Sequence, residues 1–138
     1  MAMTQAGLLE IEGAHQAFQE NGFAADYLKK QLDYALGTAA ASAALAPSYS
    51  GEYRMAIANA SETNTLAAPA FVGQVVAFGV DSRAGTGTRA ITVASAINAT
   101  GNTVATFNAT TDTLILYAMT VGGTVAWRVL LNDGVALS

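Results

Sequence analysis

The chain contains no cysteine and only one histidine, His15, among its 138 residues. The lack of cysteine excludes disulfide bridges, zinc–thiolate sites and thiol catalysis, so stability has to come from packing or oligomerisation. His15 has no second imidazole with which to share a metal, and no serine lies in a G-x-S-x-G turn for it to activate. We interpret it as a solvated surface residue, and we predict no metal, no cofactor and no enzymatic activity.

Charge is scarce as well, because only 12% of the residues are charged, whereas a typical soluble domain has about 25%. The net charge is −4, and the six basic residues form no run. The chain therefore lacks the clustered Lys and Arg that bind a phosphate backbone, and we expect no nucleic-acid partner. Thr, Asn, Ser, Gln and Ala must fill the surface. Such an exterior suits close-packed assemblies, where burying a charge is costly; an ordinary Thr-rich β-protein is the alternative.

Long apolar runs are missing too. No stretch approaches the roughly 20 apolar residues that a membrane-spanning helix needs. The N-terminal sequence MAMTQAGLLEIEG has no basic segment and no continuous apolar run, so it does not fit a signal peptide. We therefore expect no membrane partner and synthesis in a cytoplasm.

The chain changes character near residue 50. Residues 24–36 (AADYLKKQLDYAL) carry the clearest helical period. Three leucines recur every four residues along this stretch: Leu28, Leu32 and Leu36. Such a helix either packs on its own domain or docks on a neighbouring subunit, and the sequence leaves both open. An Ala-rich stretch that ends in Pro and Gly follows over residues 38–51.

Short strand-like segments separated by turn residues follow from residue 52 onward, with no helical pattern between them. The β-branched and Thr-rich composition agrees with strands. We therefore predict a mainly β fold, an antiparallel β-sandwich, jelly roll or barrel, over residues 51–138. An N-terminal helical arm and linker is expected over residues 1–50.

One glycine-rich stretch, GTGTRA at residues 85–90, matches a loose G-x-G-x-x-A pattern. A dinucleotide-binding motif needs a helix after its glycines, so that the pyrophosphate sits at the helix N-terminus. Here AITVASAIN follows and alternates like a strand. We interpret the glycines as turn residues.

The stretch TLILYAMTVGGTVAWRVLLNDGV, residues 113–135, predicts two strands joined at Gly122-Gly123. The first strand divides into two apolar rows: Leu114, Leu116 and Ala118 on one side, and Ile115, Tyr117 and Met119 on the other. The second strand places Val125, Trp127, Val129 and Leu131 on one face, with Ala126 and Leu130 opposite. A sheet with one solvated face alternates apolar and polar residues, so something has to cover the second side.

We assign the Trp127 face to the core of the protomer. One of the two rows of the first strand is then explained best as a subunit contact, and the choice between the Leu114 row and the Ile115 row stays open. Arg128 points away from Trp127 and, on a sparsely charged strand face, should need a carboxylate or carbonyl partner.

Four segments follow one another in the C-terminal part: FVGQVVAFGV, AITVASAIN, TGNTVATFNATTDTLIL and WRVLLNDGV. From Phe71 to the C-terminus the chain resembles small structural proteins of tailed bacteriophages. It is similar to head decoration (cement) proteins and related trimeric, fibre-like virion modules. The N-terminal part has no such resemblance.

The resemblance implies a homotrimer on the exterior of a capsid, bound to the major capsid protein and stabilising the shell, with the N-terminal part as an attachment arm. The alternative is a receptor- or glycan-binding tail or fibre module, which would need exposed aromatic residues. An enzyme on a β-scaffold is a third, discounted hypothesis. The candidate subunit-contact residues are Leu28, Leu32, Leu36, Ile115, Tyr117, Met119 and Arg128.

Overall fold

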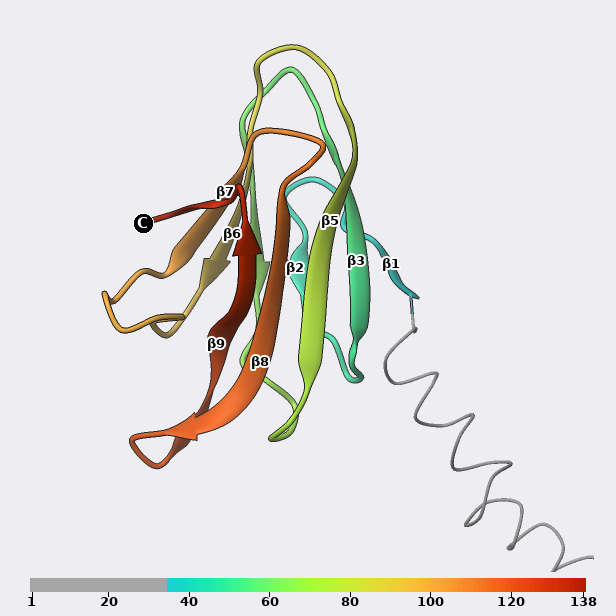
Figure 1. Ribbon diagram of the computed structural model, residues 1–138. Helices are drawn as coiled ribbons and strands as arrows, with labels where there is room; N and C mark the ends of the chain where they lie inside the picture. Colours follow the sequence, from blue (N-terminus) through green and yellow to red (C-terminus); the bar gives the residue numbers. More distant parts are fainter. Residues whose placement is uncertain (1–34) are drawn as a thin grey trace, which may run out of the picture. The chain divides into compact units, whose positions relative to one another are not determined.

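The computed structural model describes residues 35–138, and this part of the chain forms ten strands and no helix (Figure 1). The strands are β1 (Ala35–Thr38), β2 (Ala44–Leu45), β3 (Gly51–Ile57), β4 (Glu62–Leu66), β5 (Val75–Arg83), β6 (Arg89–Val93), β7 (Val104–Phe107), β8 (Thr113–Val121), β9 (Thr124–Asp133) and β10 (Ala136–Leu137). No helix that could cross a membrane occurs among these residues.

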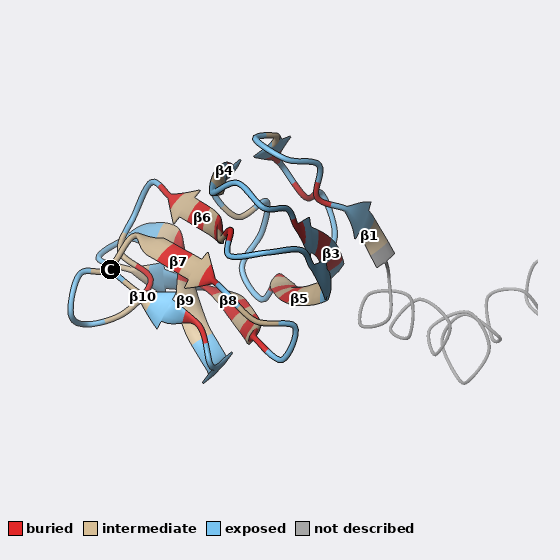
Figure 2. Cartoon of the chain, turned by 90° about the horizontal axis from the view of Figure 1, so that it is seen from above, coloured by how far each residue is buried: buried red, intermediate tan, exposed pale blue. Residues whose placement is uncertain are grey.

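The strands form two five-stranded sheets, which lie as two layers when the molecule is seen from above (Figure 2). Sheet A has the order β1-β3-β5-β8-β9, and sheet B has the order β10-β7-β6-β4-β2. The sheets are separate and do not close into a barrel. The mainly β prediction is therefore confirmed.

Both sheets are mixed, so the expected antiparallel arrangement is wrong. The first six strands alternate between the sheets: β1, β3 and β5 are parallel neighbours in sheet A, and β2, β4 and β6 are parallel neighbours in sheet B. Parallel neighbours cannot be joined by a tight hairpin, and here each connection runs through a strand of the other sheet. Only the later strands pair antiparallel, β7 and β8 against β6 and β5, with β9 and β10 outside them.

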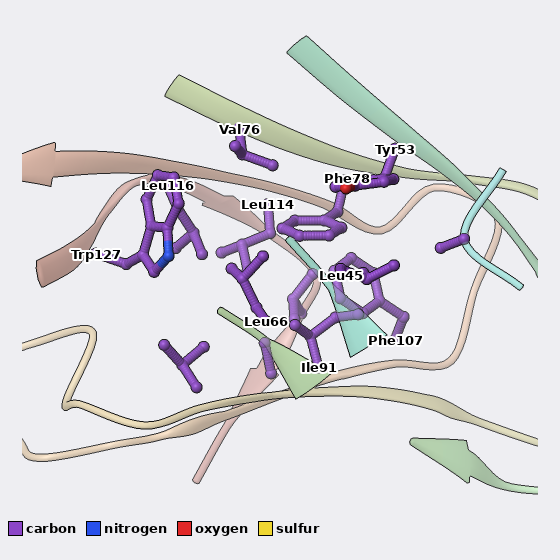
Figure 3. Packing of buried hydrophobic residues seen from close by; sticks show 14 of the residues in the cluster. Leu45, Tyr53, Leu66, Val76, Phe78, Ile91, Phe107, Leu114, Leu116 and Trp127 are labelled. Atoms are coloured by element: carbon purple, nitrogen blue, oxygen red, sulfur yellow. The ribbon is translucent and has the colours of Figure 1, made fainter. Parts of the chain in front are cut away.

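The core lies between the two sheets and comes from period-two alternation in the long strands. Sheet A buries Tyr53, Met55 and Ile57 from β3, Val76 and Phe78 from β5, Leu114, Leu116 and Ala118 from β8, and Trp127 from β9. Sheet B supplies Leu66, Ile91 and Phe107 from the opposite side (Figure 3). Val93 and Ala105 of the same sheet are also buried. The Trp127 indole Nε1 donates to the Ala67 carbonyl at 2.8 Å, so its one polar atom is satisfied inside the core.

The N-terminal boundary differs from the expected one. The helix predicted over residues 24–36 is wrong at its end, because Ala35 and Leu36 belong to β1; its earlier residues lie outside the described part of the chain. Leu36 packs against the core, and pairing with β3 overrides the local helical period. The β-unit begins at Tyr34, so the expected boundary at residue 51 falls inside it.

The strand predicted after GTGTRA is present as β6, and no helix follows the glycines. Gly87 has a specific packing reason, since a Cβ placed there would lie 2.0 Å from the Ala58 carbonyl oxygen. The β5–β6 connection therefore runs in direct backbone contact with the β3–β4 connection. A hydrogen bond from the Glu62 amide to the Thr88 carbonyl, at 2.9 Å, joins the two.

Candidate interaction surface

Sheet A turns one face away from sheet B, and along β8 and β9 this outer face is apolar. Two rows of cross-strand neighbours run over it from β5 through β8 to β9: Ala77–Ile115–Leu131 and Val75–Tyr117–Arg128. Neighbours in such rows share a face, so their side chains lie together. Met119 continues the β8 row toward the hairpin and is 42% exposed. The outer face thus presents large apolar side chains to solvent in the isolated protomer.

A β-bulge in β9 adds to this face. Ile115 lies opposite Leu131, but the next residue, Leu116, lies opposite Val129, so Leu130 is the extra residue. The expectation that Leu131 shares a face with Trp127 is therefore wrong, because the bulge reverses the alternation beyond Val129. Leu130 and Leu131 are 63% and 44% exposed.

The burial pattern shows which of the two apolar rows of β8 faces the core. The Leu114 row is fully buried between the sheets, and the Ile115 row lies on the outer face. Four candidate contact residues share the outer face: Ile115, Tyr117, Met119 and Arg128. Leu36 turns toward the core, and Leu28 and Leu32 lie outside the described residues.

Arg128 has the kind of partner that its position required. Its Nη1 donates to the Asn98 carbonyl at 2.8 Å, in the β6–β7 connection beside β9. The same connection holds the edge of β9, since the Val129 amide donates to the Ile97 carbonyl at 2.9 Å. Within residues 35–138, no carboxylate forms an ion pair with Arg128.

An open hollow of about 650 Å³ lies beside Arg128. Residues from the β6–β7 connection and from the β8–β9 hairpin line it: Ile97, Asn98, Ala99, Met119, Thr120, Val121, Gly122, Arg128 and Val129. Within the part of the chain that the structure describes, Arg128 is the one charged residue of this lining. The guanidinium therefore stands in mostly uncharged surroundings, where an approaching anion would meet little competition from the protomer itself.

The opposite side of the outer face carries charge. Arg54 of β3 pairs with Asp81 of β5, with Nε donating to Oδ1 at 2.7 Å. The Asp81 hydrogen bond and charge raise the pKa of Arg54, and Glu52 contributes least. The Glu52 carboxylate lies over Gly79, where an added Cβ would be 3.1 Å from Oε1. Glu52 is exposed, and no described residue forms an ion pair with it.

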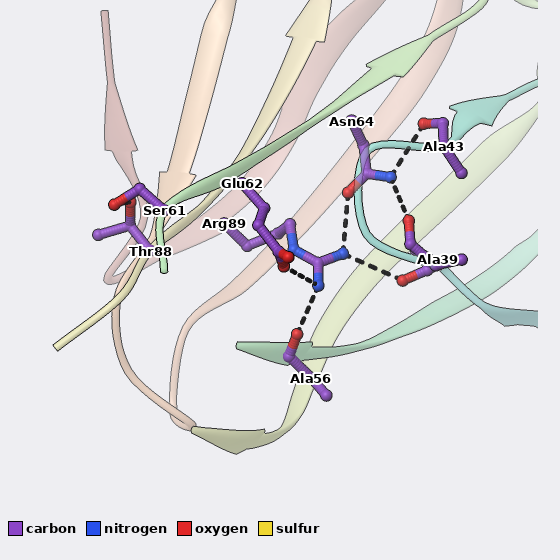
Figure 4. Close-up of polar contacts among 9 residues, drawn as sticks. Ala39, Ala43, Ala56, Ser61, Glu62, Asn64, Thr88 and Arg89 are labelled. Carbon is purple, nitrogen blue, oxygen red and sulfur yellow. Dashed lines mark hydrogen bonds and ion pairs between the residues drawn. The ribbon is translucent and has the colours of Figure 1, made fainter. Parts of the chain in front are cut away.

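A second group of polar residues surrounds Arg89, which is buried together with Asn64 (Figure 4). Arg89 donates from Nη1 to the Ala39 carbonyl and to Asn64 Oδ1, both at 3.0 Å, and from Nη2 to the Ala56 carbonyl at 2.6 Å. Nη2 also pairs with Glu62 at 3.0 Å. These bonds tie β6 to β3, to β4 and to the residue that follows β1, so this cluster holds the layers together and leaves little reactive chemistry free.

Sequence reasoning missed this cluster, although one signal pointed to it. Arg89 lies in phase with Ile91 and Val93, which places it on the inward face of β6. An inward arginine in a chain with so little charge needs buried partners. Asn64, on the inward face of β4, is one such partner, because its Oδ1 accepts a hydrogen bond from Arg89. Its Nδ2 donates to the Ala40 and Ala43 carbonyls at 2.7 and 2.9 Å.

Two further findings concern metal sites and similarity to known proteins. No group of three or more His, Asp or Glu residues that could hold a metal ion occurs over residues 35–138, and His15 lies outside this range. Comparisons with protein-family models, curated proteins and solved structures found no match for this chain.

Proposed function

We propose that this chain is a structural virion protein that decorates and stabilises a phage capsid as a homotrimer. The observation that carries the proposal is the outer face of sheet A, where Met119, Leu130 and Leu131 are exposed beside Ile115 and Tyr117. Contiguous exposed apolar patches of this kind mark interaction sites. A second copy would remove these side chains from water, as the buried cores of oligomer interfaces do.

Sparse charge supports an assembled state rather than a freely diffusing one. Arg54 is paired with Asp81, and Arg89 is buried with Glu62, so few formal charges remain to be desolvated at a subunit seam. The β8–β9 hairpin that supplies the apolar face also lies within the segment that resembles decoration proteins. These features point to surfaces, rather than to a reaction centre, as the working part of the molecule.

In this proposal, residues before the β-unit contact the major capsid protein on the capsid exterior. The test mixes purified full-length protein with expanded empty capsids and measures co-sedimentation. A variant that lacks residues 1–33 is the matched comparison, because the β-unit begins at Tyr34. A larger deletion to residue 50 would remove the buried Ala39 and Leu45 and disturb the core.

Full-length protein should sediment with the capsids, while the variant stays in the supernatant and keeps the β-sheet signal and the cooperative thermal unfolding of the β-unit in circular dichroism. Failure of the full-length protein to bind would overturn the capsid assignment. Binding by the shortened variant would retain the capsid role and move the contact to the β-unit. The gene for a major capsid protein is also expected beside the gene for this chain.

A receptor- or glycan-binding module is the second candidate, and the hollow beside Arg128 is the observation that favours it. Among the described residues, no aromatic side chain lines this hollow, and Trp127 is buried, so this part of the chain offers no platform for stacking on a sugar ring there. A glycan array read with the full chain separates the two candidates. Specific, saturable hits would favour the binding module.

A further inference from the structure

Glu52 and Arg128 stand on opposite sides of the same outer face. Glu52 lies beside Ala77, whose row continues through Ile115, and Arg128 lies opposite Tyr117 in the adjacent row. Strands β3 and β9 are separated by β5 and β8 in the sheet order. Three strand spacings amount to about 14 Å, so these two charges cannot form an ion pair within one protomer.

Both groups are available to an outside partner. The Glu52 carboxylate leans over Gly79, where the missing side chain leaves room on the outer face. Arg128 uses Nη1 for the Asn98 carbonyl and lies at the hollow beside the hairpin. Arg54, the nearest cation to Glu52 on this face, is bonded to Asp81. Each charge therefore lacks an ion-pair partner among residues 35–138.

This polarity indicates how copies of the chain would meet. An acid lies on the β3 side of the apolar rows and a base lies on the β9 side, so the two sides complement each other. Complementary sides can meet twice across a twofold contact, in which residue i meets residue j and j meets i, or once at each seam of a closed ring. The face therefore has the charge arrangement for an acid-to-base contact between copies, and the proposed homotrimer uses this contact once at each seam.

We propose that Arg128 of one protomer forms an ion pair with Glu52 of the next protomer around the homotrimer. The inference rests on the proposed homotrimer and names the contact that sets its register. The Ile115 and Tyr117 side chains are then covered between the paired charges. Charge pairs of this kind fix register and exclude wrong partners more than they add affinity.

A charge-reversal cycle tests the pairing. Glu52→Lys and Arg128→Glu are made singly and together in the full chain, and the trimer dissociation constant is measured by sedimentation equilibrium. Each single change brings like charges together and should weaken the trimer about tenfold or more. The double variant should recover most of this loss. Arg83→Glu is the matched control, since Arg83 is also exposed but lies at the end of β5.

The outcomes separate the pairing from the proposed function. A wild-type chain that stays monomeric overturns both. A wild-type trimer whose double variant is as weak as the single variants overturns the pairing alone. Rescue of Arg128→Glu by Asp133→Lys, rather than by Glu52→Lys, would also overturn it and indicate contact between two β9 strands.

Salt dependence is a second readout that does not require Arg128→Glu to fold. An intersubunit ion pair is screened as ionic strength rises, so the wild-type trimer should weaken with added salt. Glu52→Gln removes the pair at an exposed position and should flatten this dependence. An unchanged salt dependence in Glu52→Gln would contradict the pairing.

Discussion

Ile115 and Leu131 lie opposite each other on the outer face of sheet A, although simple alternation along β9 puts Leu131 on the same side as Trp127. The bulge at Leu130 makes the difference. It leaves Trp127 in the core and brings two exposed leucines to the surface formed by the Ile115 row. A single extra residue in one strand thus enlarges the apolar face that we propose as the subunit contact.

A negative charge introduced at either of two adjacent β8 residues should have different effects: at one it should destabilise the fold, and at the other it should weaken the assembly. Leu116→Asp buries an unpaired carboxylate in the core, so we expect a loss of more than about 4 kcal/mol in the free energy of unfolding. Tyr117→Asp places the same charge on the outer face and should leave the protomer folded while weakening the trimer. Urea unfolding and light scattering measure the two effects. A Tyr117→Asp protein that remains trimeric would contradict the proposed contact.

Arg89→Met should destabilise the β-unit strongly. The substitution leaves Glu62, Asn64 and two carbonyls without their donor, and removing one partner of a buried pair costs about 3–5 kcal/mol. Arg83→Met is the matched control because Arg83 is exposed, and its one side-chain hydrogen bond within residues 35–138 goes to the Gly87 carbonyl, at 3.3 Å. It should change stability by less than about 0.5 kcal/mol. Equal unfolding midpoints for the two variants would refute the structural role of Arg89.

Strand alternation predicted most of the sheet A core, with the bulge in β9 as the exception. Met55 and Phe78 lie inward in phase with their apolar neighbours, and Leu116 belongs to one of the two β8 rows between which alternation did not decide. The pattern failed for β4, whose sequence ETNTL has only one large apolar residue and places Asn64 inward. The inward Asn64 accepts a hydrogen bond from Arg89, a long-range relationship that no local period contains.

The apolar period along the sequence also could not predict the mixed topology of the two sheets. The parallel pairs β1–β3 and β2–β4 join segments that are separated in sequence by a strand of the other sheet. The edge strands β1 and β2 are short, and each contains an alanine. Of the candidate contact residues, alternation placed Ile115, Tyr117 and Met119 on one face of β8 but did not decide whether that face is the outer one. Alternation gave no reason to single out Glu52, because its importance depends on Gly79 and on the distance to Arg128 across the sheet.

Alkaline pH should lower the free energy of unfolding of the protomer through ionisation of Tyr53. Burial raises the pKa of Tyr53 above 10.0, and its ring stacks on Phe78 with 5.7 Å between centroids. The folded state therefore holds the phenolic proton more tightly than the unfolded state. The stability from this group is complete below pH 10.0 and falls as the pH rises through the folded-state pKa.

Tyr53→Phe keeps the aromatic ring and removes this titration. The difference in unfolding free energy between wild type and Tyr53→Phe should be constant at neutral pH and should change in favour of the variant above pH 10.0. Urea unfolding of both proteins across this range measures it. Parallel pH profiles for the two proteins would show that Tyr53 titrates equally in the folded and unfolded states.

The mass of the full chain in solution tests the proposed assembly most directly. Gel filtration with light scattering at low micromolar concentration should give three times the chain mass of 14.1 kDa. The Tyr117→Asp variant should move toward the single-chain mass in the same experiment. A stable wild-type monomer at that concentration would contradict the account, because the outer face of sheet A would then remain exposed to water with no copy of the chain to cover it.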